Sequence, residues 1–297
     1  MQPPGSTSCS PSIRSWLSAP ARSPHRVALD SRCVVWQLCN AGDLSVPPSF
    51  NVAADVDPAE LASELGGTLD QRGELTTPCN VLVVRADDRL ALVDTGSGSY
   101  FGGAGGGLID ALAAAGATVE DVDLVVLTHG HPDHVGGAMT ELGPACRHAR
   151  HAMSRVEYDY WSQRPEPPPF FVEQVQPLAE RGILELVETE SELLPGIRLC
   201  AAAGHTPGQC AVEVEEDERH LLFLADVVMS PVHFSQPELV GTVENDPDGV
   251  ERTRRRLLAR AADEGLLVAA SHLWHPGRVV RDGDAFRFTA VRSYELN

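Results

Sequence analysis

From Val34 onward, the apolar residues of the chain fall into short runs that are separated by polar or glycine-rich stretches. The segment NVLVVRADDRLALVDTG (80–96) holds two runs of β-forming residues around a polar turn, which predicts a β-hairpin. GGLIDALAAAG (106–116) predicts a short helix that ends at a glycine, and VDLVVLTHGH (122–131) predicts a buried strand. Strand, helix and strand in this order predict a crossover unit.

The second half of the chain has a similar rhythm. Three more apolar runs predict strands: IRLCAAAGH (197–205), RHLLFLAD (219–226) and GLLVAASH (265–272). Before the last of them we expect a helix that has Asp246 as its N-cap and Pro247 in its first turn, and that ends at about Asp263. Because a sheet buries its apolar faces under helices, we expect an α/β fold with helices outside the sheet.

The N-terminal residues differ from the rest of the chain. Residues 1–29 carry seven serines, five prolines and three arginines but no acidic residue. They lack the apolar stretch of about 7–15 residues that marks a secretory signal. We therefore expect a disordered N-terminal extension over residues 1–30 and a folded domain over residues 31–297. The alternatives for the extension are a targeting peptide, or translation from a start codon upstream of the natural one.

Charge and composition limit the partners. The formal net charge is −19, which disfavours nucleic acid because polyanion binding begins with a basic surface. All 23 basic residues are arginines, so lysine Schiff bases, P-loop lysines and lysine clamps for substrate carboxylates are excluded. The chain has no run of about 18 apolar residues that would predict a membrane span. The seven scattered cysteines include no CxxC pair, which indicates reduced thiols in a cytoplasmic protein.

The motif THGHPDHVGG places three histidines and an aspartate within six consecutive positions. His129 and His131 are two residues apart, so on an extended backbone both imidazoles point to the same side and can meet one metal ion. The proline after His131 favours that extended conformation. The chain then turns, and Asp133 and His134 can face a second point. The alternative, a solvent-exposed polar loop, does not explain why each residue here that is not Gly or Pro is a metal-ligand type.

Further ligand types stand at the ends of later apolar runs. His205 follows the first of these runs, Asp226 closes LLFLAD, and His272 closes LVAASH. Strand ends deliver polar residues to the loops that form a site. An ionised aspartate is costly to bury unpaired, so metal coordination explains Asp226. Each residue alone fits a hydrogen-bonded core position, but the three together with the HGHPDH motif indicate a metal site.

With these residues in place, the chain resembles the metallo-β-lactamase superfold of dinuclear metal hydrolases, over about residues 34–290. The resemblance implies a four-layer αββα sandwich with the metals at one edge of the two sheets. It also implies seven ligands: His129, His131 and His205 on the first ion, Asp133, His134 and His272 on the second, and Asp226 bridging both. Asp94, in the upstream LALVDTG, would not bind a metal ion itself but would orient the ligand side chains from behind. Zinc is the expected ion for this nitrogen and oxygen ligand set, with manganese, iron or cobalt as alternatives.

Within the superfold, the chain is most similar to the methyl-parathion-hydrolase-like branch, on VDTGSGSYFG, THGHPDHVGG, GHTPGQ and SHLWHPG. That branch includes phosphotriesterases, arylesterases and lactonases. Quorum-quenching lactonases of the superfold often carry a tyrosine three residues after the bridging aspartate, where this chain has Met229. Common class B β-lactamases carry a cysteine in place of the bridging aspartate. Glyoxalase II-like thioesterases hold glutathione with basic side chains that usually include lysine.

We therefore expect a hydrolase of small, neutral, hydrophobic esters: aryl esters and lactones, with phosphotriesters as a secondary activity. Metal coordination can lower the pKa of water from about 15.7 to about 7, so a metal-bridging hydroxide would attack without a covalent intermediate. The candidate catalytic residues are Asp226 and Asp133, and Asp133 would orient the nucleophile or accept its proton. The alternatives are a thioesterase of the glyoxalase II type, an iron-dependent member that is not a hydrolase, and a non-catalytic metal-binding module.

An apolar substrate would need an apolar pocket beside the metals. The side chains expected to form it are Trp161, Phe170, Phe171, Met229 and Phe234. For the aromatic residues near the proline-rich segment 164–171, the alternative is a local core. The polar surroundings of His151 predict that it is solvated. The sequence leaves open whether the protein is a monomer or a homodimer.

Overall fold

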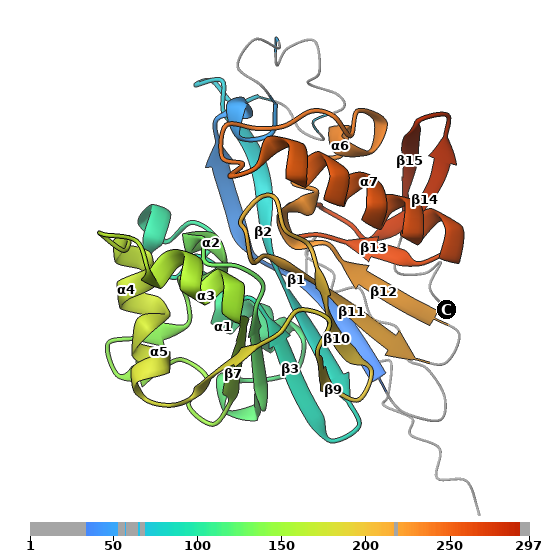
Figure 1. Ribbon diagram of the computed structural model, residues 1–297. Helices are drawn as coiled ribbons and strands as arrows, with labels where there is room; N and C mark the ends of the chain where they lie inside the picture. Colours follow the sequence, from blue (N-terminus) through green and yellow to red (C-terminus); the bar gives the residue numbers. More distant parts are fainter. Residues whose placement is uncertain (1–33, 53–56, 58–64, 66–68, 217–218, 292–297) are drawn as a thin grey trace, which may run out of the picture.

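The computed structural model describes residues 34–52, 57, 65, 69–216 and 219–291. Two mixed β-sheets face each other and helices cover their outer faces, so that the layers follow the order α, β, β, α (Figure 1). This arrangement confirms the expected fold. The N-terminal extension expected over residues 1–30 lies outside the described residues.

The first sheet contains both the predicted hairpin and the predicted crossover unit. Its strands, in spatial order, are β1 (Val34–Val46), β2 (Leu75–Ala86), β3 (Arg89–Val93), β4 (Leu124–Leu127), β7 (Arg150–Ser154) and β8 (Leu184–Val187). Strands β2 and β3 pair in antiparallel fashion. Strands β3 and β4 pair in parallel, and the chain connects them through the helix α1 (Leu108–Ala114). A two-stranded ribbon, β5 (Met139–Thr140) and β6 (Gly143–Pro144), follows the short helix α2 (Pro132–Val135) in the chain.

The second sheet contains the three strands predicted from the later apolar runs. Its spatial order is β15 (Ala285–Ala290), β14 (Gly277–Asp282), β13 (Leu267–Ala269), β12 (Arg219–Phe223), β11 (Cys210–Glu216), β10 (Ile197–Ala201) and β9 (Glu192–Leu194). Strands β12 and β13 pair in parallel, so their carboxyl ends meet at the same edge of the sheet. Residues that follow these two strands are therefore brought close together.

The longest helix of the described residues, α7 (Pro247–Glu264), begins at the predicted residue and ends one residue after Asp263, before Gly265. The Asp246 side chain accepts a hydrogen bond from Gly249 N at 3.0 Å, and Gly265 has the left-handed conformation (φ 68°) that closes a helix. The remaining helices are α2 (Pro132–Val135), α3 (Arg155–Ser162), α4 (Pro169–Gln174), α5 (Gln176–Glu180) and α6 (Val232–Ser235). Short 3-10 turns are η2 (Pro48–Phe50), η3 (Tyr100–Gly103), η4 (Val119–Asp121) and η5 (Ala225–Val227).

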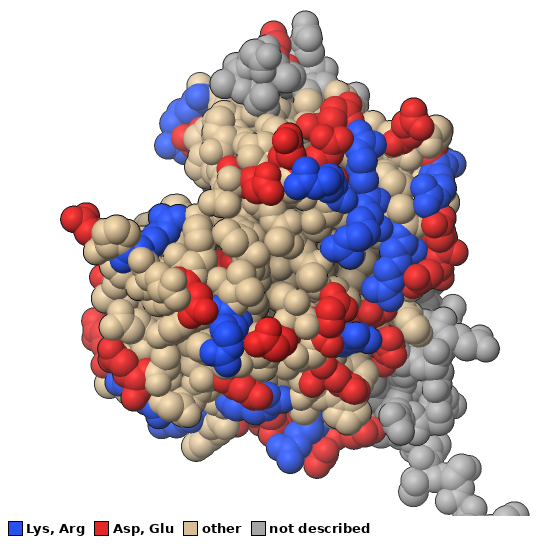
Figure 2. Space-filling view, viewed as in Figure 1, with Lys and Arg blue, Asp and Glu red and all other residues tan. Residues whose placement is uncertain are grey.

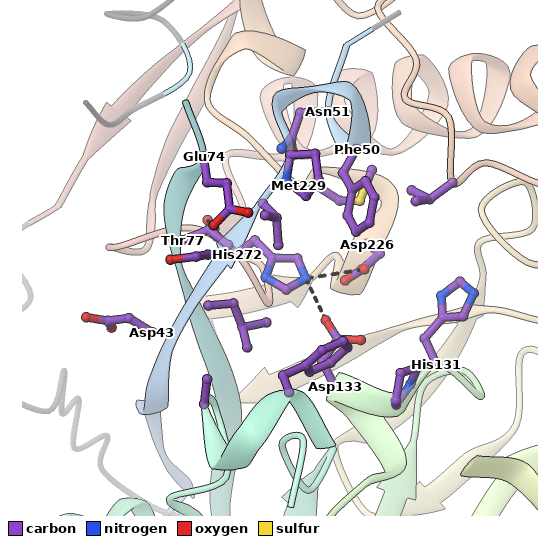
Figure 3. A pocket seen from close by; sticks show the side chains of 18 of the residues that line it. Asp43, Phe50, Asn51, Glu74, Thr77, His131, Asp133, Asp226, Met229 and His272 are labelled. Atoms are coloured by element: carbon purple, nitrogen blue, oxygen red, sulfur yellow. Dashed lines mark hydrogen bonds and ion pairs between the residues drawn. The ribbon is translucent and has the colours of Figure 1, made fainter. Parts of the chain in front are cut away.

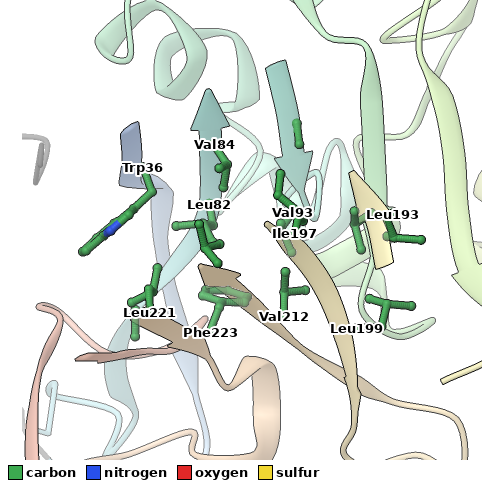
Figure 4. Packing of buried hydrophobic residues seen from close by; sticks show 14 of the residues in the cluster. Trp36, Leu82, Val84, Val93, Leu193, Ile197, Leu199, Val212, Leu221 and Phe223 are labelled. Atoms are coloured by element: carbon green, nitrogen blue, oxygen red, sulfur yellow. The ribbon is translucent and has the colours of Figure 1, made fainter. Parts of the chain in front are cut away.

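The main hydrophobic core lies between the two sheets. Successive side chains of a strand point to opposite faces, so Leu82 and Val84 of β2 meet Phe223 of β12 in this core, as Figure 4 shows. The intervening Val83 points instead to the core under α1, α3, α4 and α5. A third core lies between the second sheet and α7. His151 of β7, expected to be solvated, is fully buried, because its strand lies inside the sheet, between β4 and β8.

The surface over α7 carries a stripe of arginines with acidic side chains beside them (Figure 2). Arg255 Nε lies 2.7 Å from Glu251 Oε1, and Arg260 Nε lies 3.0 Å from Glu264 Oε2. These one-turn pairs partly neutralise the stripe. Within the described part of the chain, no helix is both long and apolar enough to cross a bilayer.

Candidate metal centre

Three histidines converge at one edge of the sheets, and we call them the three-histidine set. His129 and His131 follow β4, and His205 follows β10. His131 is extended (φ −72°, ψ 153°), as the proline after it predicts. His131 Nδ1 lies 3.1 Å from His129 Nε2 and 2.9 Å from His205 Nε2. Tetrahedral ligands with Zn–N bonds of about 2.1 Å lie about 3.4 Å apart, so three imidazoles at this spacing suit one ion.

Four other side chains form a second group, the mixed set: Asp133, His134, Asp226 and His272. The one-turn helix α2 directs Asp133 and His134 toward it, and Asp226 and His272 come from the chain after β12 and β13. His272 Nε2 lies 3.4 Å from Asp133 Oδ2 and 3.3 Å from Asp226 Oδ2. Asp226 Oδ2 also lies 3.5 Å from His205 Nε2, so this carboxylate stands between the two sets.

Acceptors behind the site hold the outer ring nitrogens of three histidines. The pairs are His134 Nδ1 with Asp94 Oδ2 at 2.8 Å, His205 Nδ1 with Glu244 Oε2 at 2.8 Å, and His272 Nδ1 with the Pro78 carbonyl at 2.9 Å. Carboxylates and carbonyls only accept hydrogen bonds, so each Nδ1 carries the proton. The Nε2 atoms therefore present lone pairs toward the centre, which is how a protein prepares histidine for a metal.

Asp94 lies directly behind His134 of the mixed set. Its carboxylate accepts hydrogen bonds from the backbone N and the Oγ1 of Thr128, each at 2.8 Å, besides the contact with His134. Thr128 directly precedes the HGHPDH motif, and its Oγ1 in turn lies 3.1 Å from His129 Nδ1. Asp94 thus connects the end of β3 to both sets.

The polar atoms of the mixed set fit a cation. Among the described residues, the buried His134 Nε2 and Asp226 Oδ1 have no hydrogen-bond partner, although they lie only 3.3 Å apart. Two lone pairs that face each other at this distance repel unless a proton or a metal ion lies between them. The chain contains no lysine, and none of the ion pairs in the described part joins an arginine to Asp133 or Asp226. Together with the three-histidine set, these residues fit two divalent ions.

The two sets differ in electrostatic character. Burial alone would lower the pKa of His272, but Asp226 and Asp133 outweigh it and raise that pKa to about 10. In the three-histidine set, burial and then the neighbouring His205 lower the pKa of His131 to about 3. Without ions, the mixed set therefore holds protons while His131 is neutral. A metal ion must displace protons from the mixed set in order to bind there.

Side chains of both sets line the floor of a cavity of about 720 Å³, a volume typical of small-molecule sites. Its walls are largely apolar and include Leu44, Val46, Pro47, Phe50, Phe101 and Met229. Figure 3 shows Phe50 and Met229 above Asp226 and His272, with Asp133 below these two. Asp43, Arg72 and Glu74 also line the cavity, and Arg72 Nη2 lies 3.0 Å from Glu74 Oε2.

The structure corrects the expected composition of the pocket wall. Met229 lines the cavity, but Trp161, Phe171 and Phe234 are buried in hydrophobic cores. Phe170 packs on Trp161 with ring centroids 5.3 Å apart. The aromatic residues of the insertion thus follow the local-core alternative, because α3 and α4 turn them toward the outer face of the first sheet. Apart from Met229, the walls come mainly from β1, η2, η3 and the start of β2.

The chain is similar to known proteins over most of its length. Residues 76–272 match the metallo-beta-lactamase superfamily. The N-acyl homoserine lactonase AiiB of Agrobacterium fabrum (strain C58) is 24% identical over 219 residues, which make up 66% of this chain and 79% of that protein. AiiB of Rhizobium rhizogenes (strain K84) is 26% identical over 179 residues, which cover 58% of this chain and 64% of that protein, slightly under two thirds of its length.

Solved structures share the fold. The hydrolase AbOPH of the beta lactamase superfamily has a TM-score of 0.79 and 22% identity, and the match covers 92% of this chain and 99% of that one. AidC, a dizinc quorum-quenching lactonase in complex with a product, has a TM-score of 0.78 and 22% identity, and the match covers 91% of this chain and 98% of that one. The family match and the similarity to lactonases, with the αββα sandwich and the two groups of side chains that could hold metal ions, identify a metal-dependent hydrolase. The chain belongs to the metallo-beta-lactamase superfamily.

Proposed function

We propose that this protein uses two divalent metal ions to hydrolyse small, neutral, hydrophobic esters. Aryl esters and lactones are the main proposed substrates, and phosphotriesters are a secondary activity. One observation carries this proposal: the three-histidine set and the mixed set lie together on the floor of a cavity with apolar walls. The ligands supply the chemistry of hydrolysis, and the walls suit an uncharged acyl or aryl group.

In this proposal each set holds one ion. The proposed ligands are His129, His131 and His205 for the first ion, Asp133, His134 and His272 for the second, and Asp226 for both. The position of Asp226 Oδ2, 3.3 Å from His272 Nε2 and 3.5 Å from His205 Nε2, supports the shared role. Zinc is the proposed ion, because imidazole and carboxylate are its common ligands.

When bound, the two ions supply a water of lowered pKa as the nucleophile and polarise the oxygen of the ester carbonyl. Asp133 has a side chain that is 16% exposed, against 4% for Asp226, so it is the carboxylate that reaches further into the cavity. We assign to Asp133 the orientation of the attacking water and the acceptance of its proton. Met229 stands on the cavity wall, and none of the described lining residues is a tyrosine, so the proposed reaction uses no phenol.

The charges around the cavity favour neutral substrates. Asp43 and Glu74 line it, and the one cation among the described lining residues outside the ligand sets, Arg72, is paired with Glu74. A substrate with several carboxylates, such as a glutathione thioester, would meet this negative field without a free cation to bind it. The names of the similar proteins AiiB and AidC support lactones among the neutral esters.

The test is a comparison of kcat/KM on the zinc-loaded protein for five substrates: an aryl acetate, an N-acyl homoserine lactone, a phosphotriester, S-lactoylglutathione and a penicillin. We expect the aryl ester or the lactone to lead. A tenfold preference for S-lactoylglutathione or the penicillin, about 1.4 kcal/mol of transition-state stabilisation, would overturn the substrate assignment and leave the metal site in place.

A further inference from the structure

A carboxylate that faces none of the proposed ligands is fully buried behind the three-histidine set. Glu157 stands in the first turn of α3, and its oxygens accept hydrogen bonds from four donors. Oε1 accepts from Gly130 N at 2.9 Å and from Trp161 Nε1 at 2.6 Å. Oε2 accepts from Thr206 Oγ1 at 2.7 Å and from Gly208 N at 3.0 Å. Burial raises the pKa of Glu157, and the four hydrogen bonds oppose that rise.

The two oxygens of this carboxylate bind two different ligand loops. Gly130 lies between His129 and His131, and Thr206 directly follows His205. We propose that Glu157 is a positioning residue, which clamps these loops together and thereby sets the spacing of the three-histidine set. The inference rests on the proposed function, because it assigns that set to one metal ion. It deepens that function by naming the residue that aligns the ion's ligands from behind.

The backbone of both loops approaches α3 so closely that only glycine fits. A Cβ atom on Gly208 would lie 2.0 Å from Glu157 N, and a Cβ atom on Gly130 would lie 2.3 Å from Trp161 Nε1. Both distances are far below a van der Waals contact, so the glycines allow the amide groups to reach the carboxylate. The clamp thus consists of one acidic residue and two glycines that the sequence places far apart.

The chemistry of the clamp requires a carboxylate. All four neighbours are donors toward Glu157, and a carboxylate accepts from all of them without offering a hydrogen. Glu157→Gln keeps the shape but turns an NH2 group toward one pair of donors. If that group faces Thr206, the hydroxyl can rotate and accept, but the Gly208 amide still loses its partner. In either orientation, therefore, one loop loses at least the hydrogen bond from its backbone amide to residue 157.

The experiment measures zinc affinity by competition with a chelator, for the wild type, Glu157→Gln and Trp161→Phe. Trp161→Phe is the matched control, since it removes a donor from the same carboxylate but leaves both loops bound to it. We expect Glu157→Gln to weaken one of the two ions by about 10–100-fold and to leave the other unchanged. The control should retain both ions. In ion-free protein, hydrogen exchange should become faster at the Gly130 or Gly208 amide of Glu157→Gln.

Each outcome decides between the two proposals. Wild-type affinity for both ions in Glu157→Gln, an equal loss of both ions, or the same loss in the control would overturn the clamp while the dinuclear function stands. A wild type that holds fewer than two ions would overturn the proposed function, and the amide exchange of ion-free Glu157→Gln would then decide the clamp. If Glu157→Gln does not fold, Thr206→Val removes one donor on the His205 side and should weaken the same single ion.

Discussion

The buried imidazole of His151 predicts a loss of stability in mild acid that one substitution removes. His151 lies in β7, opposite Val125 of β4, and among the described residues neither ring nitrogen has a hydrogen-bond partner. Burial lowers its pKa from about 6.5 to about 4. The backbone of Ala149 partly opposes this fall in the pKa, but it makes no hydrogen bond of normal geometry with the His151 ring. The folded protein thus keeps this ring neutral, whereas the unfolded chain protonates it near its ordinary pKa.

The magnitude follows from the linkage between protonation and folding. Because the folded pKa is depressed, the unfolded chain binds the extra proton between pH 6.5 and 4, and stability falls as the pH falls through this window. A tenfold difference in proton affinity between the folded and unfolded states is worth about 1.36 kcal/mol. The fall in the pKa of His151 from 6.5 to about 4 therefore removes about 3.4 kcal/mol of stability below pH 4. At pH 5, about 2 kcal/mol of that amount is already lost relative to pH 7.5.

The assay is the free energy of unfolding of metal-free protein from urea titrations at pH 7.5, 6 and 5. His151→Leu has a side chain of similar volume that does not titrate, so it should lose about 2 kcal/mol less than the wild type between pH 7.5 and 5. Val125→Ala is the control: it damages the same core and should lower stability equally at each pH. The same pH dependence in His151→Leu as in the wild type would refute the reasoning.

Three further predictions concern the site. Glu244→Leu should weaken zinc binding by about 10–100-fold in chelator competition, because it removes the acceptor that orients His205, a proposed ligand; unchanged affinity would contradict that role. Gly130→Ala should lower both the melting temperature and the zinc content, because its Cβ would lie 2.3 Å from Trp161 Nε1; a variant with normal zinc content would show that the loop can shift freely. Phe50→Ala should raise KM about fivefold more for an octanoyl than for a butanoyl ester, because the longer acyl chain loses roughly 40 Å² of apolar contact, worth about 1 kcal/mol at ~25 cal/mol per Å². Equal changes in KM for the two esters would exclude contact between Phe50 and the end of the acyl chain.

Local sequence patterns predicted the elements that carry the site. The hairpin of β2 and β3 and the helix α7 follow from apolar runs, a polar turn and capping residues that act over a few positions. The structure also brings together the seven side chains proposed as ligands, since strand ends of two packed sheets meet at one edge. The hairpin and the helix could be predicted because strand patterns, turns and caps are local properties of the sequence.

The pocket wall and the supporting residues could not be predicted in this way. Glu157 and Glu244 stand in polar segments and look like surface residues, and only the packing of α3 and α7 against distant loops buries them. His151 follows an arginine in a polar stretch, yet its strand is covered on both sides. Trp161 was expected on the pocket wall. Because Gly130 has no side chain, Trp161 packs instead behind the loop that carries His129 and His131.

The central claim, a hydrolase that requires two metal ions, is tested most directly by a titration of metal-free protein with zinc. Bound zinc and the hydrolysis of an aryl acetate are measured together at each addition. We predict saturation at about two ions per chain, with activity that rises mainly as the second ion binds. Full activity at one ion per chain, or no hydrolysis at two, would contradict this claim.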